Sequence, residues 1–300
     1  MKFAARGLLL VASAHAAACG GGGITPIRTP FNRGVYLYST GDYDQAIAEY
    51  RQALEEEPAD YRARFNLAVA LEASAAEHAA AGDAEAGERL RAAAEAEYRA
   101  LAEGERGELR ASINLAALEF ERGERAAARA RLQALLAAHP EVTLVRTALA
   151  AQRLAEKDAQ GAVELLTAAV RRDPGSLTAQ RLLGDALRVL GEVDRARAAY
   201  RQALRRDAAD PGTLLALGQL ELEAGRADEA AVWLARLLLI DPDHHQGHLL
   251  QSRAMEQLGE LEEATLHLWL ARRSAKAGDD AGTSQRLVEL YRRLLEGERR

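Results

Sequence analysis

The sequence predicts an all-α fold in which short helical hairpins stack side by side into a solenoid. An alanine recurs every 34 residues over five copies, and a fixed period in this range is typical of stacked repeats. Within each copy, apolar residues follow helical spacing on two segments that are separated by a short break. Neither segment is long enough to be stable alone, so each hairpin must pack on its neighbours. The recurring alanines are Ala128, Ala162, Ala196, Ala230 and Ala264.

The copy from Gly184 to Ala208 shows this arrangement most clearly. Its first helix is apolar on one face up to Leu190, and a break follows at Gly191 and Glu192. Its second helix places small and large apolar residues at helical spacing. Two helices cross closely only where side chains are small, and a bulky residue then fills the adjacent gap.

This pattern resembles the tetratricopeptide repeat (TPR) family. That family has a small residue in the first helix, an alanine early in the second, a bulky apolar residue four positions later and a closing proline. The resemblance covers about seven copies between residues 27 and 278, and it implies a right-handed TPR superhelix. The small positions are Gly34, Ala68, Ala116, Ala150, Gly184, Gly218 and Ser252, and the bulky positions are Tyr50, Tyr98, Leu132, Leu166, Tyr200, Leu234 and Leu268.

The first 30 residues form a separate element in front of the repeats. Two basic residues precede a short apolar run, Gly7–Ala14, and small residues follow it. This order is typical of a bacterial export signal, and the run is too short to cross a bilayer. The segment Ala16–Cys19 resembles a lipoprotein processing box, which implies a signal peptide over 1–18 and a lipid on Cys19. The glycines and prolines of 19–30 would then form a tether.

Two alternatives for this segment stay open. Ordinary cleavage after Ala16 or Ala18 would give a soluble exported protein, and an unprocessed segment would remain as a tail. If Cys19 is lipidated, the resemblance implies a bacterial cell envelope. The next residue is Gly20 rather than the aspartate that commonly keeps lipoproteins in the inner membrane, so we expect the outer membrane, facing the periplasm.

The second repeat, 61–108, is longer than the others because Ala46 and Ala94 are 48 residues apart. Its turn is expected at Gly82, which leaves both helices lengthened by two turns. The extension is a tolerated insertion or a knob that contacts a partner. The repeat array is expected over 31–278, followed by a capping helix within 279–300 whose one face packs on the stack.

In the TPR family the first helix of each repeat lines a concave groove that holds a partner. By the phase of the pattern, the groove is apolar in the first half of the chain and charged in the second. The alternatives are core packing for Phe65, Ile113 and Phe120, and plain solvent exposure for the polar residues. Asn66 and Asn114 occupy equivalent places where an amide could bond an extended peptide backbone. The predicted groove residues are Phe65, Asn66, Val69, Ile113, Asn114, Phe120, Leu154, Arg181, Asp185, Arg188, Gln219 and Arg253.

No motif predicts catalysis or a cofactor, so we expect a protein that is not an enzyme. The net charge of −6 argues against a nucleic-acid binder that works by neutralising phosphates. One alternative is a zinc site, and with it a hydrolase, at His244, His245 and His248. The structural alternative is an ordinary inter-repeat turn in which Asp243 caps the next helix.

These observations predict a protein–protein interaction scaffold of the bacterial cell envelope that holds a protein or peptide in its groove. The architecture also fits assembly of an envelope complex, and one specific alternative is a lipoprotein that assembles a type IV pilus secretin. Membrane attachment is expected through the lipid on Cys19. Self-association through the open ends of a solenoid remains a third possibility.

Overall fold

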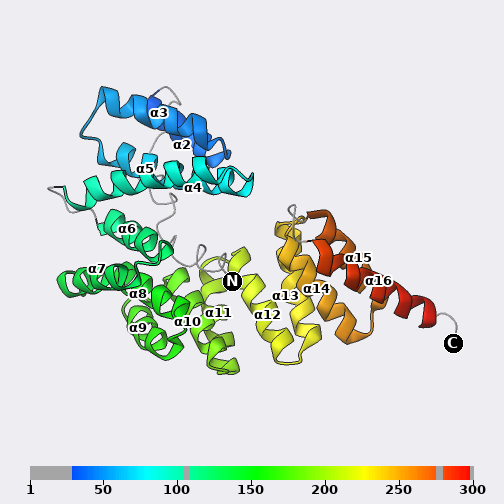
Figure 1. The fold of residues 1–300 in the computed structure, drawn as a ribbon. Helices are drawn as coiled ribbons and strands as arrows, with labels where there is room; N and C mark the ends of the chain where they lie inside the picture. Colours follow the sequence, from blue (N-terminus) through cyan, green and yellow to red (C-terminus); the bar gives the residue numbers. More distant parts are fainter. Residues whose placement is uncertain (1–28, 105–108, 275–279, 298–300) are drawn as a thin grey trace. The chain divides into compact units, whose positions relative to one another are not determined.

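Helices make up the part of the chain that the computed structural model describes, residues 29–104, 109–274 and 280–297 (Figure 1). These ranges contain fifteen helices, α2 to α16, and no strand. The predicted all-α class is therefore confirmed. None of the described helices is long and apolar enough to cross a membrane.

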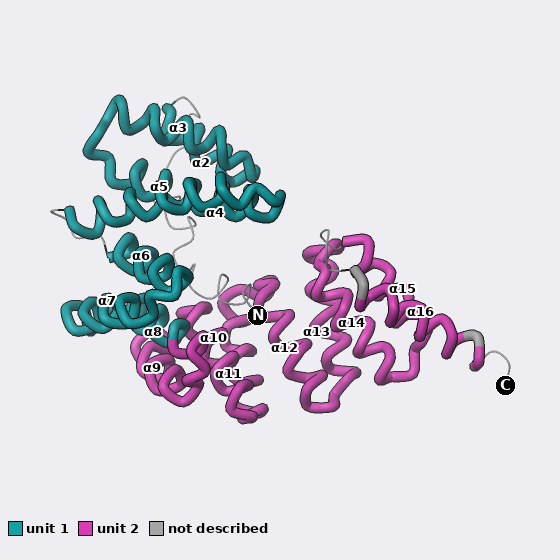
Figure 2. The backbone as a smooth tube through the Cα atoms, viewed as in Figure 1, with its two compact units in different colours: residues 1–152 teal, residues 153–300 magenta. Residues whose placement is uncertain are grey.

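The chain divides into two compact units, residues 1–152 and 153–300 (Figure 2). The boundary lies inside α8, whereas the sequence predicts one continuous array from 31 to 278. Each unit buries bulky residues of its own, such as Tyr98 in the first and Leu234 in the second. The two cores therefore form from repeats that lie close together in the chain.

The first unit contains three complete hairpins, α2–α3, α4–α5 and α6–α7, followed by most of α8. Consecutive helices pack on each other from α2 to α7, as stacking of hairpins requires. The bounds are α2 Pro30–Ser39, α3 Tyr43–Glu56, α4 Tyr61–Ala80, α5 Ala84–Ala102, α6 Leu109–Glu121, α7 Arg125–Ala138 and α8 Thr143–Ala155.

The second unit contains α9, three hairpin pairs and a final single helix. The first helices α10, α12 and α14 contact one another in that order, and each packs on the second helix of its own pair. The bounds are α9 Ala159–Arg172, α10 Leu177–Val189, α11 Val193–Arg206, α12 Pro211–Glu223, α13 Ala227–Ile240, α14 His245–Leu258, α15 Leu261–Ser274 and α16 Asp280–Gly297.

Glycine in a first helix allows the bulky residue of the second helix to approach closely. A Cβ atom added to Gly184 would lie 2.4 Å from Cε1 of Tyr200. A Cβ atom added to Gly218 would lie 2.5 Å from Cγ of Leu234. Both distances are far below van der Waals contact between carbon atoms. The phase that the sequence predicts for these small and bulky positions is the one the structure shows.

The turn between α8 and α9 lacks the glycine that the turns of the other helix pairs contain. Gly191, for example, has φ 75° between α10 and α11, whereas Lys157 adopts φ 67° between α8 and α9. A left-handed residue with a Cβ atom costs about 1–2 kcal/mol. Asp158 accepts a hydrogen bond from the Gly161 amide at 2.9 Å and one from Arg153 Nη1 at 2.5 Å. These bonds fix the turn and offset part of the strain.

The second hairpin is longer than the others, with 20 residues in α4 and 19 in α5, against 13 in α6. Its turn lies at Gly82, with φ 92°. The base of the extension packs on α3, where Ser74 Oγ donates to Asp44 Oδ1 at 2.6 Å. Gly87 crosses α4 so closely that a Cβ atom would lie 3.0 Å from the Ala75 carbonyl oxygen. The extension is therefore integrated into the unit only at its base, where Ser74, Ala75 and Gly87 are buried, and most of its residues from Ala76 to Glu85 are exposed.

Helix α16 covers the end of the second unit, packing on α15. Leu287 and Leu290 are buried, and Arg286 and Arg293 each lie 2.5 Å from a carboxylate oxygen of Glu256 in α14. Tyr291 is 48% exposed, although the sequence predicts it on the buried stripe. It lies one residue, or about 100° of rotation, beyond Leu290, so the buried stripe is narrower than predicted.

Candidate functional site

The candidate site is a line of polar side chains across three neighbouring first helices of the second unit. We call it the polar row. Because α10, α12 and α14 follow one another in contact, equivalent positions on them form a continuous line. The polar row consists of Arg181, Asp185 and Arg188 of α10, Gln219 and Glu223 of α12, and Arg253 of α14.

Asp185 is the centre of the α10 part of the polar row. Its Oδ1 accepts a hydrogen bond from the Tyr200 hydroxyl at 2.7 Å, and its Oδ2 lies 3.4 Å from Arg181 Nη1. Burial raises the pKa of Asp185, against the opposing effects of Arg181, the Tyr200 hydroxyl and Arg188. Burial and the Asp185 charge together raise the pKa of Tyr200, so the phenol stays protonated and remains a donor.

Arg188 connects α10 to α12. Its Nη1 lies 2.8 Å and 3.1 Å from the two carboxylate oxygens of Glu223. Gln219 Nε2 donates to the same carboxylate at 2.8 Å. These charge-assisted bonds fix three side chains on two helices before any ligand arrives. Arg253, one repeat further on, is exposed to solvent.

Two predicted groove residues of the first unit have a different role in the structure. Asn66 and Asn114 are buried, and their side chains donate to the hydroxyls of Tyr50 and Tyr98 respectively. The Tyr98 hydroxyl in turn donates to Glu72 Oε2 at 2.5 Å. The expectation that these amides meet a peptide backbone is thus corrected, because each one satisfies the buried tyrosine of the preceding repeat.

The apolar groove candidates of the first unit are also largely inside it. Ile113 is fully buried, and Val69 and Phe120 are 4% and 8% exposed. Phe65 is half-buried, with its ring 5.8 Å from that of Tyr98. This corrects the apolar groove predicted for the first half, because α6 is packed on every side from Ala111 to Phe120. Leu154, at the start of the second unit, is half-buried.

The three candidate metal ligands do not meet at one point. His244 Nδ1 accepts from the Gly247 amide at 2.9 Å and caps α14, so the cap is His244 and not the predicted Asp243. His245 Nδ1 lies 2.7 Å from the Ala271 carbonyl oxygen. Among the side chains that the structure describes, no group of three histidine, cysteine or carboxylate residues could hold a metal ion.

His248 forms a pair with His267 of α15. The two Nδ1 atoms are 3.0 Å apart, and His248 Nε2 lies 2.8 Å from the Pro242 carbonyl oxygen. Burial and the neighbouring His248 lower the pKa of His267 to about 4, so this imidazole is neutral at neutral pH. His248 Nε2 donates to the Pro242 carbonyl oxygen, and one of the two Nδ1 atoms donates to the other, which makes the pair a packing contact between α14 and α15.

Cys19, the signal peptide over 1–18 and almost all of the tether over 19–30 lie outside the described residues. The structure therefore describes the repeats and leaves the predicted lipid attachment as a prediction.

Family models match most of the repeat array. A tetratricopeptide repeat model matches residues 153–211 and 190–254, a TPR repeat model matches 34–74, and a further tetratricopeptide repeat model matches 113–176. Together these matches cover more than half of the chain. The chain belongs to the tetratricopeptide repeat family. No curated protein matches the sequence.

Solved structures of TPR proteins share this fold. A tetratricopeptide repeat protein from Parabacteroides merdae is 16% identical with a TM-score of 0.56, and 87% of this chain and 96% of that chain are covered. The APC/C hetero-tetramer Cut9–Hcn1 is 14% identical with a TM-score of 0.61, and 87% of this chain aligns with 49% of that chain. At these identities the likeness shows the TPR fold alone.

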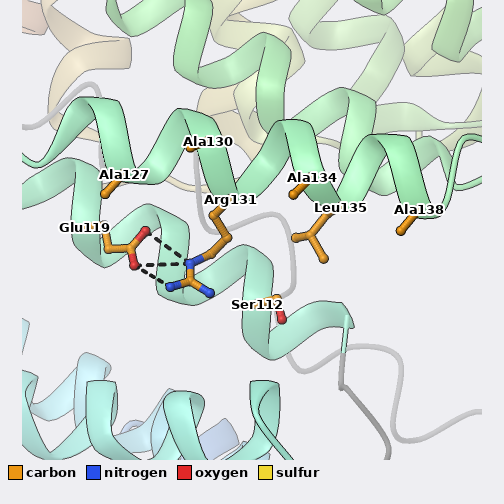
Figure 3. A pocket seen from close by; sticks show the side chains of 8 residues that line it. All are labelled: Ser112, Glu119, Ala127, Ala130, Arg131, Ala134, Leu135 and Ala138. Carbon is orange, nitrogen blue, oxygen red and sulfur yellow. Dashed lines mark hydrogen bonds and ion pairs between the residues drawn. The ribbon is translucent and has the colours of Figure 1, made fainter.

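A cavity of about 560 Å³ lies on the first unit of this TPR protein, lined by α6 and α7 (Figure 3). Four alanines and Leu135 form most of its wall. Arg131 and Glu119 point toward each other there, with Nη2 and Oε1 2.7 Å apart. The two charges neutralise each other, which leaves the Ser112 hydroxyl as the polar group next to alanine walls. The cavity therefore lacks the convergent polar groups of a ligand site.

Glu223 and Tyr200 belong to the site, although the sequence pattern alone does not select them as groove residues. Glu223 lies four residues after Gln219 on α12, so helical spacing predicts that their side chains meet. Tyr200 occupies the bulky TPR position, which normally indicates packing. Its hydroxyl contact with Asp185 becomes visible only when both helices are placed.

Proposed function

We propose that this TPR protein is an interaction scaffold of the bacterial cell envelope that holds a partner protein along the polar row. The observation that carries the proposal is that polar-row side chains in a TPR fold are already hydrogen-bonded, Asp185 to Tyr200 within one repeat and Arg188 to Glu223 across two repeats. A binding surface whose side chains are already fixed loses less conformational entropy when a partner arrives. The alternative of a histidine metal site has no comparable support.

The charge arrangement favours an extended polar segment as the bound part of the partner. Arg181 and Asp185 lie 3.4 Å apart, and Glu223 accepts from both Arg188 and Gln219. The internal pairs leave alternating positive and negative atoms along the row. Such a surface suits a segment with backbone amides and mixed charges better than a uniformly charged polymer.

A photo-crosslinking residue at Arg253 is expected to capture a discrete partner in cells, because Arg253 extends the polar row and is exposed. The matched control is the same residue at Gln202 of α11, which is exposed on a second helix. Crosslinked species are separated by gel electrophoresis and identified by mass spectrometry. Equal capture from both positions would contradict the assignment of the partner surface to the first helices.

The envelope location is proposed from the lipoprotein-like segment around Cys19. We expect Cys19→Ala to weaken membrane attachment, so that less of the protein is recovered in the membrane fraction, because the acyl chains would be missing. Incorporation of labelled palmitate into the wild type, and its loss in the variant, would check the chemistry directly. Membrane retention of the variant together with unlabelled wild type would rule out the lipid anchor.

A further inference from the structure

Helix α13 exposes apolar side chains on the face that points away from α12 and α14. Val232 is 60% exposed, Leu239 is 83% exposed and Ile240 is 46% exposed. Because Leu234 and Leu237 are buried on the other side, the helix is apolar around most of its circumference. A surface helix normally carries polar residues on its outer face, so this outer face requires an explanation.

The C-terminal turn of α13 differs from the C-terminal turns of the other second helices in this unit. At the same position, α9 carries Arg171 and Arg172, and α11 carries Arg205 and Arg206, all of them exposed. Helix α15 carries Arg272 and Arg273 in its last turn. Basic residues at helix C-termini are favourable, which accounts for the arginine pairs. Only α13 among these four has an apolar pair, Leu239–Ile240, so the edge is basic on both sides of an apolar centre.

The two tryptophans of the chain lie on second helices of this edge, Trp233 on α13 and Trp269 on α15. Trp269 of α15 is 45% exposed, and the Arg273 guanidinium carbon lies 5.4 Å from its ring centroid. Trp233 of α13 is half-buried, with the Arg236 guanidinium 5.1 Å from its ring. Ala231 of α13 packs against an apolar cluster that α14, α15 and α16 form together. The two tryptophan–arginine pairs are therefore on the second helices of two consecutive repeats.

The acidic residues of this edge are mostly engaged in the inter-repeat turns. Asp173 Oδ1 accepts from the Gly175 amide at 3.1 Å, and Asp207 Oδ1 accepts from the Ala209 amide at 2.9 Å. Asp243 lies 3.6 Å from Arg273 in a pair that is exposed on both sides, which gives little binding energy in water. The six arginines in the last turns of α9, α11 and α15 outnumber the five aspartates of the described inter-repeat turns, Asp173, Asp207, Asp210, Asp241 and Asp243. The edge is therefore net positive in a chain whose net charge is −6.

We infer that this edge rests on an anionic lipid surface, with Leu239, Ile240 and Trp269 entering the headgroup region and the arginines meeting lipid phosphates. Apolar and tryptophan side chains surrounded by basic residues have the composition of an interfacial membrane contact. A nucleic acid would pair with the arginines but would leave Leu239 and Ile240 in water. The contact adds to the lipid attachment proposed at Cys19 and does not require it.

The test is flotation of the purified full chain carrying Cys19→Ser, which removes acylation, with vesicles of phosphatidylglycerol and phosphatidylethanolamine. We expect binding to these vesicles and little binding to neutral phosphatidylcholine vesicles. The decisive variant is L239R/I240R, which gives α13 the arginine pair that α9 and α11 already carry, so folding should be preserved. Although it adds positive charge, we expect about ten-fold weaker binding because apolar insertion is lost.

Tryptophan emission gives a second measurement. It should shift to shorter wavelength on adding anionic vesicles, and Trp269→Phe should remove most of the shift while leaving flotation detectable. Absence of flotation, or L239R/I240R binding as strongly as the parent, would overturn the inference. A wild type that ignores vesicles but forms a dimer in sedimentation, which L239R/I240R abolishes, would assign the edge to a second copy instead. Failure of the wild type to incorporate labelled palmitate would contradict only the lipid anchor proposed at Cys19, and not the membrane contact of this edge.

Discussion

Replacing Gly184 with leucine is expected to destabilise the second unit by at least about 1–3 kcal/mol. Even the first added atom would lie 2.4 Å from the Tyr200 ring. Tyr200 cannot easily move away, because it is fully buried and its hydroxyl is bonded to Asp185 at 2.7 Å. The crossing of α10 and α11 would have to open. Urea unfolding followed by far-ultraviolet circular dichroism measures the change in unfolding midpoint.

Two further variants separate overpacking from a general intolerance of substitution. Gly212→Ala places a Cβ atom no closer than 3.6 Å to a neighbour, so its effect should stay within about 0.5 kcal/mol. The double variant Gly184→Ala/Tyr200→Leu reproduces the alanine–leucine pair that the third repeat has at Ala116 and Leu132. It should lose less stability than Gly184→Leu does. A wild-type midpoint for Gly184→Leu would contradict the close crossing.

The fold could be predicted because the same packing constraint repeats along the chain. A small residue facing a bulky one is a contact between neighbouring helices, and the sequence period states it several times. The turn at Lys157 departs from the glycine pattern, yet the stack persists since Asp158 fixes that turn by its own hydrogen bonds. Local sequence therefore determines each hairpin, and the period determines how the hairpins follow one another.

The charged groove candidates on α10 lie near the surface, whereas most apolar candidates of the first unit are buried, for a physical reason. Phase identifies which face of a helix a residue occupies, and Arg181, Asp185 and Arg188 share a face of α10 as expected. Phase does not say how closely neighbouring helices cover that face. The apolar side chain of Ile113 is equally suited to a groove and to a core. In the structure α6 is buried from Ala111 to Phe120, so Ile113 lies in the core.

Hydrogen-bond partners were the least predictable part. A buried tyrosine hydroxyl needs a partner, but the sequence offers several polar residues at suitable distances. Asn66 and Asn114 bond tyrosines of the preceding repeat, whereas Tyr200 bonds Asp185 of its own repeat. Similarly, His244 rather than Asp243 caps α14. Such choices depend on side-chain positions that the repeat pattern does not encode.

Removing the Glu221 carboxylate is the other change for which we expect a large loss of stability. Glu221 is completely buried on α12. Its Oε1 lies 2.7 Å from Arg197 Nε, and its Oε2 lies 2.6 Å from Arg226 Nε. Glu221→Ala would leave two guanidinium groups without their buried counter-charge, for an expected destabilisation of about 3 kcal/mol. Glu221→Gln keeps an acceptor for one arginine, so a smaller loss of about 1–2 kcal/mol is expected.

The matched control is Glu229→Ala, since Glu229 is an exposed partner of Arg226 at 3.5 Å and should change stability by less than about 1 kcal/mol. Equal unfolding midpoints for the two alanine variants would show that burial adds nothing to the Glu221 network. Glu221→Met tests a further point, because the equivalent positions hold Leu187 and Met255, which are buried. Arg197 can keep Asp194 and Arg226 can keep Glu229 as partners. A methionine variant more stable than alanine would therefore show that the pocket accepts apolar packing, and that the loss in alanine comes from the cavity as well as from the charges.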